Sequence, residues 1–188
     1  MARPRSDDKR SAIMSAAVRV IASGGLGAPT AMIAKEAGVS NGSLFTYFET
    51  KDDLFNQLYV ELKVEMAAAA LAGLPAESGV RDQMSHLWSG WLHWATSCPD
   101  KRRTLAHLDV SDEITPTSRR GAHQAMAAIA RLLERSHENG PMRDAPLALV
   151  VALMSALADA TIDFMIRDPV NADEHARSGF NALWRIIA

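Results

Sequence analysis

The sequence has little cysteine, few aromatic residues and no long uninterrupted hydrophobic run. The single Cys98 excludes a disulfide framework and any cysteine-rich metal site. No segment has the basic start, apolar middle and small-residue cleavage site of a signal peptide. The longest apolar run, residues 145–158, contains Ser155 and stops at Asp159, so we expect it to be too short to span a bilayer. These absences predict a soluble, cytoplasmic protein with no membrane partner.

Motifs for catalysis and cofactor binding are also missing. The chain has no nucleotide-binding glycine loop, no nucleophile elbow and no H-E-x-x-H motif. His86 and His93 are seven residues apart, whereas two zinc ligands on one helical face would be four apart. We therefore predict a protein that is not an enzyme, with no catalytic residues, no cofactor and no metal site.

Charge is distributed unevenly along the chain, although the net charge of the 188 residues is only −2. Residues 1–51 hold seven Lys or Arg and four Asp or Glu, which gives +3. Residues 52–188 hold thirteen Lys or Arg and eighteen Asp or Glu, which gives −5. A basic segment before an acidic one suggests two different functions, but an imbalance this small is common and decides nothing alone.

Apolar residues recur with helical spacing almost everywhere, and no clear alternation of apolar and polar residues indicates a strand. A first helix carries Ile13 to Ile21 and stops at the SGG of residues 23–25. Further helices are expected over residues 30–37, 40–48, 51–72, 79–97, 100–108, 115–138, 145–167 and 172–187. The predicted fold is all-α, with about nine helices: a three-helix head (residues 1–51) and a larger bundle (residues 52–188).

Capping residues mark the starts of three of these helices. Thr30 is expected to cap the second helix, and Ser40 the third. Thr50, with Asp53 three residues later, forms a start similar to a capping box for the fourth. Gly38 can adopt the positive φ of a tight turn between the second and third helices. The spacing from residue 30 to residue 48 is therefore that of a helix-turn-helix.

The third helix, within VSNGSLFTYF (residues 39–48), is unusually uncharged for a short surface helix. If Leu44 and Phe48 face the interior, the outward face is small, neutral and able to form hydrogen bonds. Such a face allows close approach to base edges in the major groove. Gly42 costs about 1 kcal/mol of helix propensity relative to alanine, a cost that close approach would explain. The pattern predicts a recognition helix, and a surface helix with an incidental glycine is the alternative.

The stretch TAMIAKEAGVSNGSLFTYFETKDDLF (residues 30–55) resembles the helix-turn-helix signature of the TetR family of bacterial transcriptional regulators. The resemblance implies that Thr30, Tyr47 and Lys51 contact phosphates. Phe45 stands where the family usually has tyrosine, so a hydroxyl contact to phosphate is lost and apolar contact with a thymine methyl remains. The full predicted DNA-binding set is Thr30, Ser40, Asn41, Gly42, Ser43, Phe45, Thr46, Tyr47 and Lys51, of which Asn41, Gly42, Ser43 and Thr46 are implied to lie nearest the bases.

The segment ARPRSDDKR (residues 2–10) offers Arg3, Arg5, Lys9 and Arg10 before the first apolar face. It could be a flexible arm that reaches the DNA backbone or the minor groove. It could equally be a solvated, disordered start of the chain. The sequence leaves both open.

The larger bundle carries three tryptophans within seven residues, Trp88, Trp91 and Trp94. Helical spacing places Trp91 and Trp94 on the apolar face of their helix and Trp88 at its edge, which makes Trp88 the best candidate for a pocket. A small apolar or aromatic effector is the expected ligand, although plain core packing is the alternative. The predicted lining is Leu62, Met66, Met84, Trp88, Trp91, Met126 and Met154.

The last two expected helices predict a homodimer. The helix over residues 145–167 is apolar on nearly every side and must be covered on nearly every side. Two such helices from each subunit would form a four-helix interface, as the family resemblance also implies, and two heads would then meet a near-palindromic operator. The leading interpretation is a repressor that a small molecule releases from double-stranded DNA. The alternatives are a DNA-binding module without an effector and a small-molecule-binding protein or enzyme with a vestigial head.

Overall fold

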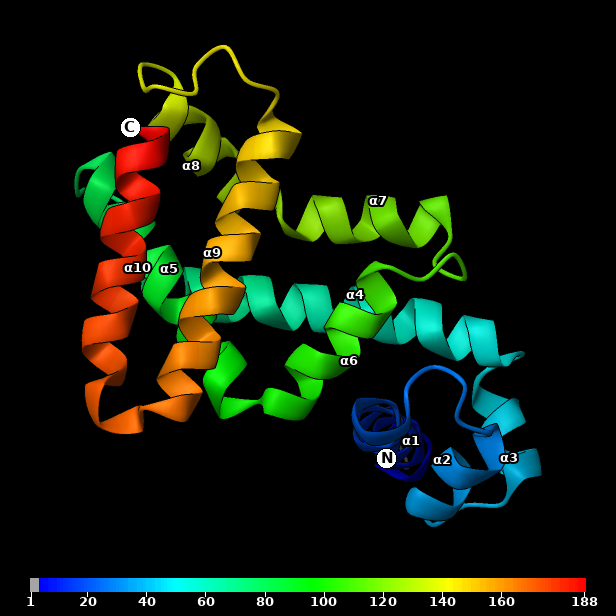
Figure 1. Cartoon of the computed structure of the whole chain (residues 1–188). Coiled ribbons are helices and arrows are strands. Elements are labelled where there is room, and N and C mark those ends of the chain that lie inside the picture. The colour runs from blue at the N-terminus through cyan, green and yellow to red at the C-terminus, as the bar shows by residue number, and fades with distance from the viewer. Residues whose placement is uncertain (1–3) are drawn as a thin grey trace. The chain divides into compact units, whose positions relative to one another are not determined.

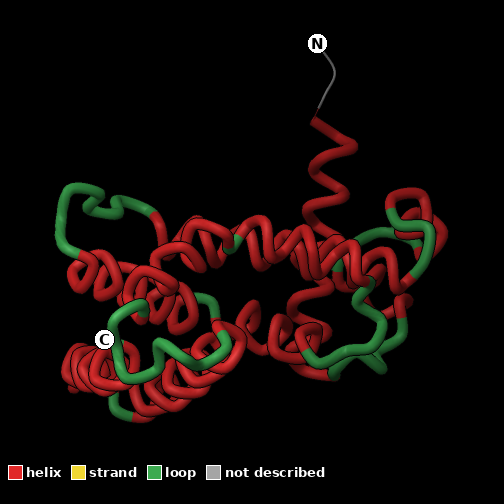
Figure 2. The backbone as a smooth tube through the Cα atoms, turned by 90° about the horizontal axis from the view of Figure 1, so that it is seen from above, coloured by secondary structure: helices red, strands yellow, loops and turns green. Residues whose placement is uncertain are grey.

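The computed structural model of the chain describes residues 4–188, and their regular secondary structure is entirely helical (Figure 1, Figure 2). The prediction of an all-α fold is confirmed. The helices are α1 (Pro4–Gly24), α2 (Thr30–Glu36), α3 (Asn41–Tyr47), α4 (Lys51–Leu71), α5 (Val80–Ser97), α6 (Pro99–Asp109), α7 (Pro116–Ala125), α8 (Ala127–His137), α9 (Leu147–Arg167), the short 3-10 helix η1 (Pro169–Asn171) and α10 (Ala172–Ile187).

The structure differs from the expected helices in two places. The helix expected over residues 115–138 is two helices, α7 and α8, which are separated at Met126, where φ is −87° and ψ is −1°. No proline or glycine stands at this break, so no local signal marks it. In addition, α1 begins at Pro4 and therefore includes much of the basic segment that was expected to precede it.

The described residues fall into two compact units. The first unit contains the chain up to Val64 together with Cys98–Gln124, and the second contains Glu65–Ser97 together with Ala125–Ala188. In the first unit, α1 packs against α2 and α6, and α2 packs against α3. As the helical spacing predicts, the apolar face of α1 forms the core of this unit through Ile13, Ala16, Ala17, Val20 and Ile21.

Polar side chains fix α6 and the loop after it within the first unit. The hydroxyl of Thr104, fully buried on α6, donates to the carbonyl oxygen of Val18 on α1 at 2.9 Å. The amide of Asn56, on α4, donates to the carbonyl oxygen of Glu113 at 2.9 Å and accepts from the backbone N–H of Thr115 at 2.8 Å. Because buried polar groups are costly when unpaired, these contacts favour the observed position of α6 and its loop.

The second unit is built on α5, which packs against α8, α9 and α10. Helices α9 and α10 run side by side and are joined through η1 (Figure 1). Gly179 allows their close approach, because a Cβ atom there would collide with the side chain of Thr161 on α9. The ring of Trp88, on α5, would lie 3.0 Å from the same Cβ. The three helices therefore meet tightly around one glycine.

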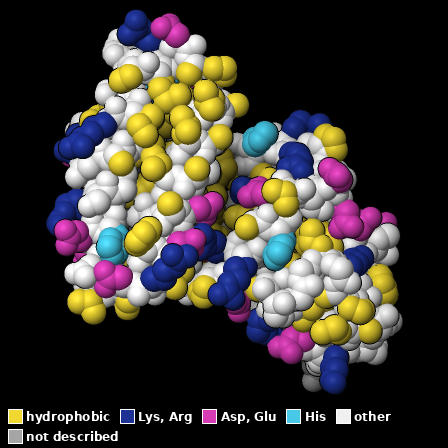
Figure 3. Space-filling model, viewed as in Figure 1, with side chains coloured by type: hydrophobic (Ala, Val, Ile, Leu, Met, Phe, Trp, Pro, Cys, Tyr) yellow, Lys and Arg dark blue, Asp and Glu magenta, His cyan; other side chains and the backbone are white. Residues whose placement is uncertain are grey.

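Helix α9 leaves much of its apolar surface uncovered within the chain. Four large side chains on it, Leu149, Val151, Phe164 and Ile166, are exposed by 38–55%. Figure 3 shows hydrophobic side chains gathered over this helix. Among the described residues, α9 is also the one helix long and apolar enough to cross a membrane by length and composition alone. We expected the apolar run of residues 145–158 to be too short to span a bilayer, but the helix that contains most of it is long enough, so that expectation is wrong. An apolar helix of a soluble protein passes the same test of length and composition.

Candidate nucleic-acid interface

The helix-turn-helix of the first unit begins at α2 and turns at Gly38. The N–H of Gly38 bonds to the carbonyl oxygen of Lys35 at 3.1 Å, and that of Val39 bonds to Ala34 at 2.9 Å. With Gly38 at a φ of +69°, these two bonds form a Schellman motif, which ends the helix and reverses the chain. Thr30 does not cap α2 as predicted: it is the first helical residue, and Pro29 occupies the cap position without a side-chain bond.

The start of α3 is capped as predicted. The hydroxyl oxygen of Ser40 accepts a hydrogen bond from the backbone N–H of Ser43 at 3.1 Å. Leu44 and Phe48 are both fully buried, so the side of α3 predicted to face the interior does so. Since a helix with one face anchored turns the opposite face outward, the position of these two residues decides which side chains of α3 reach solvent.

The residues predicted to lie nearest the bases are on that outward surface. Asn41, Gly42 and Thr46 are exposed, and so is Phe45 beside them, which is 41% accessible. Ser40 is exposed at the cap, whereas Ser43 beside it is half-buried. Of the four residues assigned to the bases, Asn41, Gly42 and Thr46 are therefore exposed on one short helix, and Ser43 is half-buried.

The residues predicted to contact phosphates flank this surface and are half-buried: Thr30, Tyr47 and Lys51. Lys51 is the first residue of α4, and its ammonium lies 5.3 Å from the centre of the Phe55 ring. The capping-box prediction is confirmed at this helix start, because Thr50 accepts from the N–H of Asp53 at 3.0 Å and Asp53 accepts from that of Glu49 at 3.1 Å. The cap formed by Thr50 and Asp53 fixes the start of α4, and the contact with the Phe55 ring positions the side chain of Lys51.

Gly42 has no structural requirement within the chain. Apart from its chain neighbours and the backbone of its own helix, a Cβ atom at this position would meet only the Ser40 hydroxyl oxygen, at 4.0 Å, and the φ of Gly42 is not positive. Alanine would therefore fit in the folded protein and would favour the helix by about 1 kcal/mol. Neither packing within the chain nor backbone conformation accounts for the glycine.

The basic segment at the start of the chain is partly helical and partly engaged. Arg10 donates to Gln57 at 2.9 Å and pairs with Glu61 at 3.4 Å, so it is tied to α4. Lys9 is exposed on the same helix. The prediction of a flexible or disordered segment is wrong from Pro4 onward. Arg3 lies outside the described residues, as does the side chain of Arg5.

Sequence reasoning did not identify the contacts that hold the interface in position. Arg19, on α1, donates to Glu36, on α2, at 2.7 Å. The guanidinium of Arg10 lies 5.7 Å from the centre of the Phe48 ring. The first contact joins two helices and the second joins α1 to the residue that follows α3, and such pairs leave no periodic signal in a sequence. They matter because they set the position of α2 and α3 on α1.

The side chains predicted to line an effector pocket are mostly core residues. Leu62 belongs to the first unit, and the other six belong to the second. Trp88 is not at an edge as predicted: it is 3% exposed, and its indole N–H donates to the carbonyl oxygen of Ala176 at 2.9 Å. The half-buried members are Trp91 and Met126, whereas Leu62, Met66, Met84, Trp88 and Met154 are buried.

Comparison with known proteins agrees with the geometry of the first unit. Residues 13–58 match the family model described as bacterial regulatory proteins of the TetR family. This range begins in α1, contains the whole of α2 and α3, and ends in α4. Residues 13–58 are a TetR-family segment, and the described chain has the TetR-regulator fold.

Solved structures similar to this chain cover nearly all of it. A TetR-family transcription regulator from Shewanella sp. PV-4 is 27% identical, with a TM-score of 0.83 over 94% of this chain and 96% of that one. A TetR-family regulator from Marinobacter aquaeolei VT8 is 22% identical, with a TM-score of 0.80 over 96% and 95%. The TetR-like regulator LfrR from Mycobacterium smegmatis, solved in complex with proflavine, is 20% identical, with a TM-score of 0.69 over 96% and 98%.

Proposed function

We propose that this TetR-type chain is a cytoplasmic transcriptional regulator that binds double-stranded DNA, acts as a repressor, and is released by a small molecule. In this proposal, residues 1–51 bind DNA, and residues 52–188 bind the effector and form the dimer. The observation that carries it is the outward face of α3, where Asn41, Gly42, Phe45 and Thr46 are exposed within a segment that matches the family model. The protein acts by binding and not by catalysis.

Recognition by this surface divides into two kinds of contact. Contacts to phosphates position a protein on the duplex, whereas contacts to base edges specify the sequence. Lys51 and its flanking residues Thr30 and Tyr47 are assigned to the phosphates, and the exposed residues of α3 are assigned to the bases. Substitution at Lys51 should therefore weaken binding to every sequence, and substitution at Thr46 or Asn41 should change which sequence is preferred.

The experiment is a binding selection with the full-length chain on random DNA duplexes, followed by affinity measurements at several salt concentrations. Lys51→Ala should lower affinity for all selected duplexes and reduce the slope of log affinity against log salt by about 0.9 for each lost phosphate contact. Arg131→Ala is the matched control, since it removes one positive charge from an exposed position on α8 in the second unit. The proposal fails if no duplex is enriched, or if Lys51→Ala and Arg131→Ala behave alike.

For the effector, the proposal places the ligand among the predicted lining residues of the second unit. Trp91 is the best probe, because it is half-buried and in edge contact with Trp88, with the ring centres 6.3 Å apart. LfrR is described in complex with the flat aromatic compound proflavine, which supports an aromatic ligand class here. An effector that prefers the DNA-incompetent conformation by about 1–3 kcal/mol would weaken operator binding about 5- to 150-fold. Titration of aromatic compounds into the protein–DNA complex tests this, and a regulator without an effector would show no release.

For assembly, the proposal is a homodimer through α9 and α10. The exposed apolar side chains of α9 support it, because contiguous apolar surface of this kind marks an interaction site. A two-fold dimer would present two copies of α3 to half-sites related by the same symmetry. The expected operator is therefore near-palindromic.

A further inference from the structure

A cavity of about 500 Å³ opens on the surface of the first unit. Helix α4 supplies most of its wall, between Asp53 and Val64, and Arg10 of α1 and Ser118 of α7 complete it. The cavity shares no residue with the predicted effector lining. Its volume falls within the range of pockets that bind small molecules.

The wall that α4 supplies joins a polar part to an apolar part. Gln57, Val60, Glu61 and Val64 stand at positions i, i+3, i+4 and i+7, so they form one stripe along the helix. Val60 is half-buried, and Val64 is 48% exposed. A molecule bound on this stripe would rest an apolar part on the two valines and hold a polar or charged group beside Glu61.

The charge of the wall favours a cation. Its charged side chains are Arg10, Asp53 and Glu61, one positive against two negative, which leaves −1. The Asp53 carboxylate is engaged within α4, since it accepts from the backbone N–H of Glu49 at 3.1 Å and from the side-chain amide of Gln57 at 3.0 Å. The Glu61 side chain is 53% exposed, so a cation from solution can reach it.

Arg10 now holds the place beside Glu61 that such a cation would take. Its guanidinium donates to Gln57 at 2.9 Å but lies 3.4 Å from the Glu61 carboxylate. An ion pair this exposed contributes little to stability, because water and salt screen it. Exchange of Arg10 for another cation at Glu61 therefore costs little, and Arg10 keeps Gln57 as a partner.

We propose that this cavity binds a small organic cation with an apolar body, whose charged group replaces Arg10 at Glu61. The site is separate from the effector pocket proposed for the second unit, and its ligand differs in charge from a neutral apolar effector. The binding itself does not depend on the proposed DNA-binding function.

Occupation of the cavity should also reach the helix-turn-helix. The Arg10 guanidinium lies 5.7 Å from the centre of the ring of Phe48, the residue that follows α3. A ligand that draws Glu61 away from Arg10 changes the contacts that hold this guanidinium beside the ring. The affinity for DNA should therefore change when the cation binds, and this second consequence rests on the proposed function.

The test uses three compounds of similar size and different charge: benzylammonium, benzyl alcohol and benzoate. Each is titrated into the full-length chain without DNA, and binding is followed by the NMR chemical shifts of the protein amides. Benzylammonium should produce saturable shifts around Glu61 and Val64. Benzyl alcohol should bind more weakly, and benzoate should not bind there, because the wall carries net negative charge.

Two substitutions should change the affinity for benzylammonium in opposite directions. Glu61→Gln removes the carboxylate and should weaken binding by about two- to fivefold, the range of one exposed ion pair. Arg10→Gln removes the competing cation and should strengthen binding by a similar factor.

The Arg19–Glu36 pair provides the matched control, because it also joins α1 to another helix and its side chains are 50% and 47% exposed. Neither residue lines the cavity. Arg19→Gln and Glu36→Gln should leave benzylammonium binding unchanged. Thermal melting of all four variants verifies that they fold.

The inference is overturned if benzylammonium gives no saturable shifts, if benzoate shifts the same signals equally, or if Glu61→Gln and Arg10→Gln change affinity in the same direction. Saturating benzylammonium should change the affinity of the wild type, but not of Glu61→Gln, for the duplex selected above. An unchanged wild-type affinity would overturn the link to the helix-turn-helix. If no duplex is selected at all, the proposed function fails, and the NMR titration still decides whether the cavity binds the cation.

Discussion

The indole N–H of Trp88 donates to the carbonyl oxygen of Ala176 at 2.9 Å and so ties α5 to α10. The ring beside this bond lies against Gly179, where a Cβ atom would approach it to 3.0 Å. A side chain so placed is part of the packing of the second unit. The tryptophan that the helical wheel favoured as a pocket wall therefore has a structural role, which changes the choice of residues for a search for the effector.

Trp88→Phe should destabilise the second unit. The phenyl ring keeps most of the apolar contact but loses the indole hydrogen bond to the carbonyl oxygen of Ala176, and the net loss of one such bond is about 0.5–1.5 kcal/mol. Trp91→Phe, at the half-buried neighbour, should cost less. Urea denaturation followed by circular dichroism measures both changes in the free energy of unfolding. Equal losses in the two variants would contradict the role assigned to the Trp88 bond.

Gly42→Ala should separate stability from DNA binding. Since the position is open and has an ordinary φ, alanine should raise the free energy of unfolding by about 0.5–1 kcal/mol through helix propensity. The added methyl group should at the same time weaken operator binding, because it stands between α3 and the bases. Thermal melting and DNA binding are measured on the same preparation.

The matched control is Gly79→Ala, because Gly79 is equally open and precedes α5 in the second unit. This variant should leave DNA binding unchanged. If Gly42→Ala bound the operator as tightly as the wild type, the glycine would have no role in close approach.

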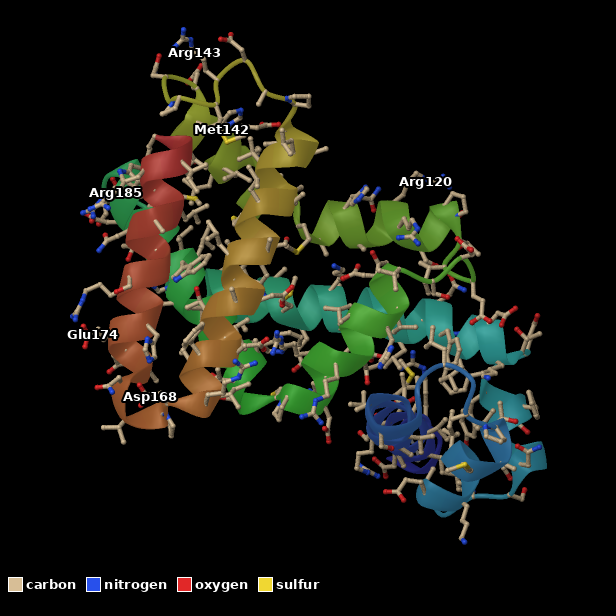
Figure 4. All side chains as sticks on the ribbon, viewed as in Figure 1. Arg120, Met142, Arg143, Asp168, Glu174 and Arg185 are labelled. Carbon is tan, nitrogen blue, oxygen red and sulfur yellow. The ribbon has the colours of Figure 1, made fainter. Side chains whose placement is uncertain are left out.

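Asp168 should make the stability of the folded protein depend on pH in the acidic range. It lies in the turn between α9 and α10 (Figure 4) and accepts hydrogen bonds from Asn171 and from His175, each at 2.9 Å. These bonds, with that from Asn171 first, lower the pKa of Asp168 from its ordinary value of 3.8. A carboxyl group whose pKa is lower in the folded state than in the unfolded state stabilises the folded state at any pH above its unfolded-state pKa. This contribution is lost as the pH falls through its folded-state pKa.

The measurement compares the melting temperatures of the wild type and of Asp168→Asn from about pH 7 down to about pH 3. The wild type should be the more stable protein at neutral pH, and the difference should shrink in acid. Asp112→Asn, at an exposed position in the loop after α6, is the control and should track the wild type throughout. A difference that stayed constant with pH would show that the Asp168 charge is not what matters.

The α9 surface should control assembly. Leu149→Glu and Phe164→Glu each place a charge on a side chain that is about half exposed within the chain and, in the proposed dimer, buried. Removal of one large apolar group from such a contact costs about 1.5–3 kcal/mol, so the dimer dissociation constant should rise by about tenfold or more. Sedimentation velocity at micromolar concentration measures the shift.

Val110→Glu provides the comparison, because Val110 is 83% exposed and lies after α6 in the first unit. It should leave the association state unchanged. A wild-type protein that sedimented as a monomer at these concentrations would rule out the proposed dimer.

What the sequence determined by itself was local. The helical period placed Ile13 and Ile21 in the core, Ser40 capped α3 because its hydroxyl reaches a backbone N–H three residues away, and Gly38 ended α2 with a positive φ. These features depend on residues within one or two turns of each other. For this reason the helix-turn-helix and its outward face could be predicted from the residues alone.

The tertiary structure decided what depends on distant partners. Trp88 is buried because α10 supplies a carbonyl oxygen and a glycine beside it, and Arg10 is engaged because α4 supplies Gln57. The break at Met126 and the association of α6 with α1 carry no periodic signal either. The spacing of apolar residues in the sequence shows which face of a helix is buried. Only the tertiary structure shows which other helix covers that face and which polar groups meet there.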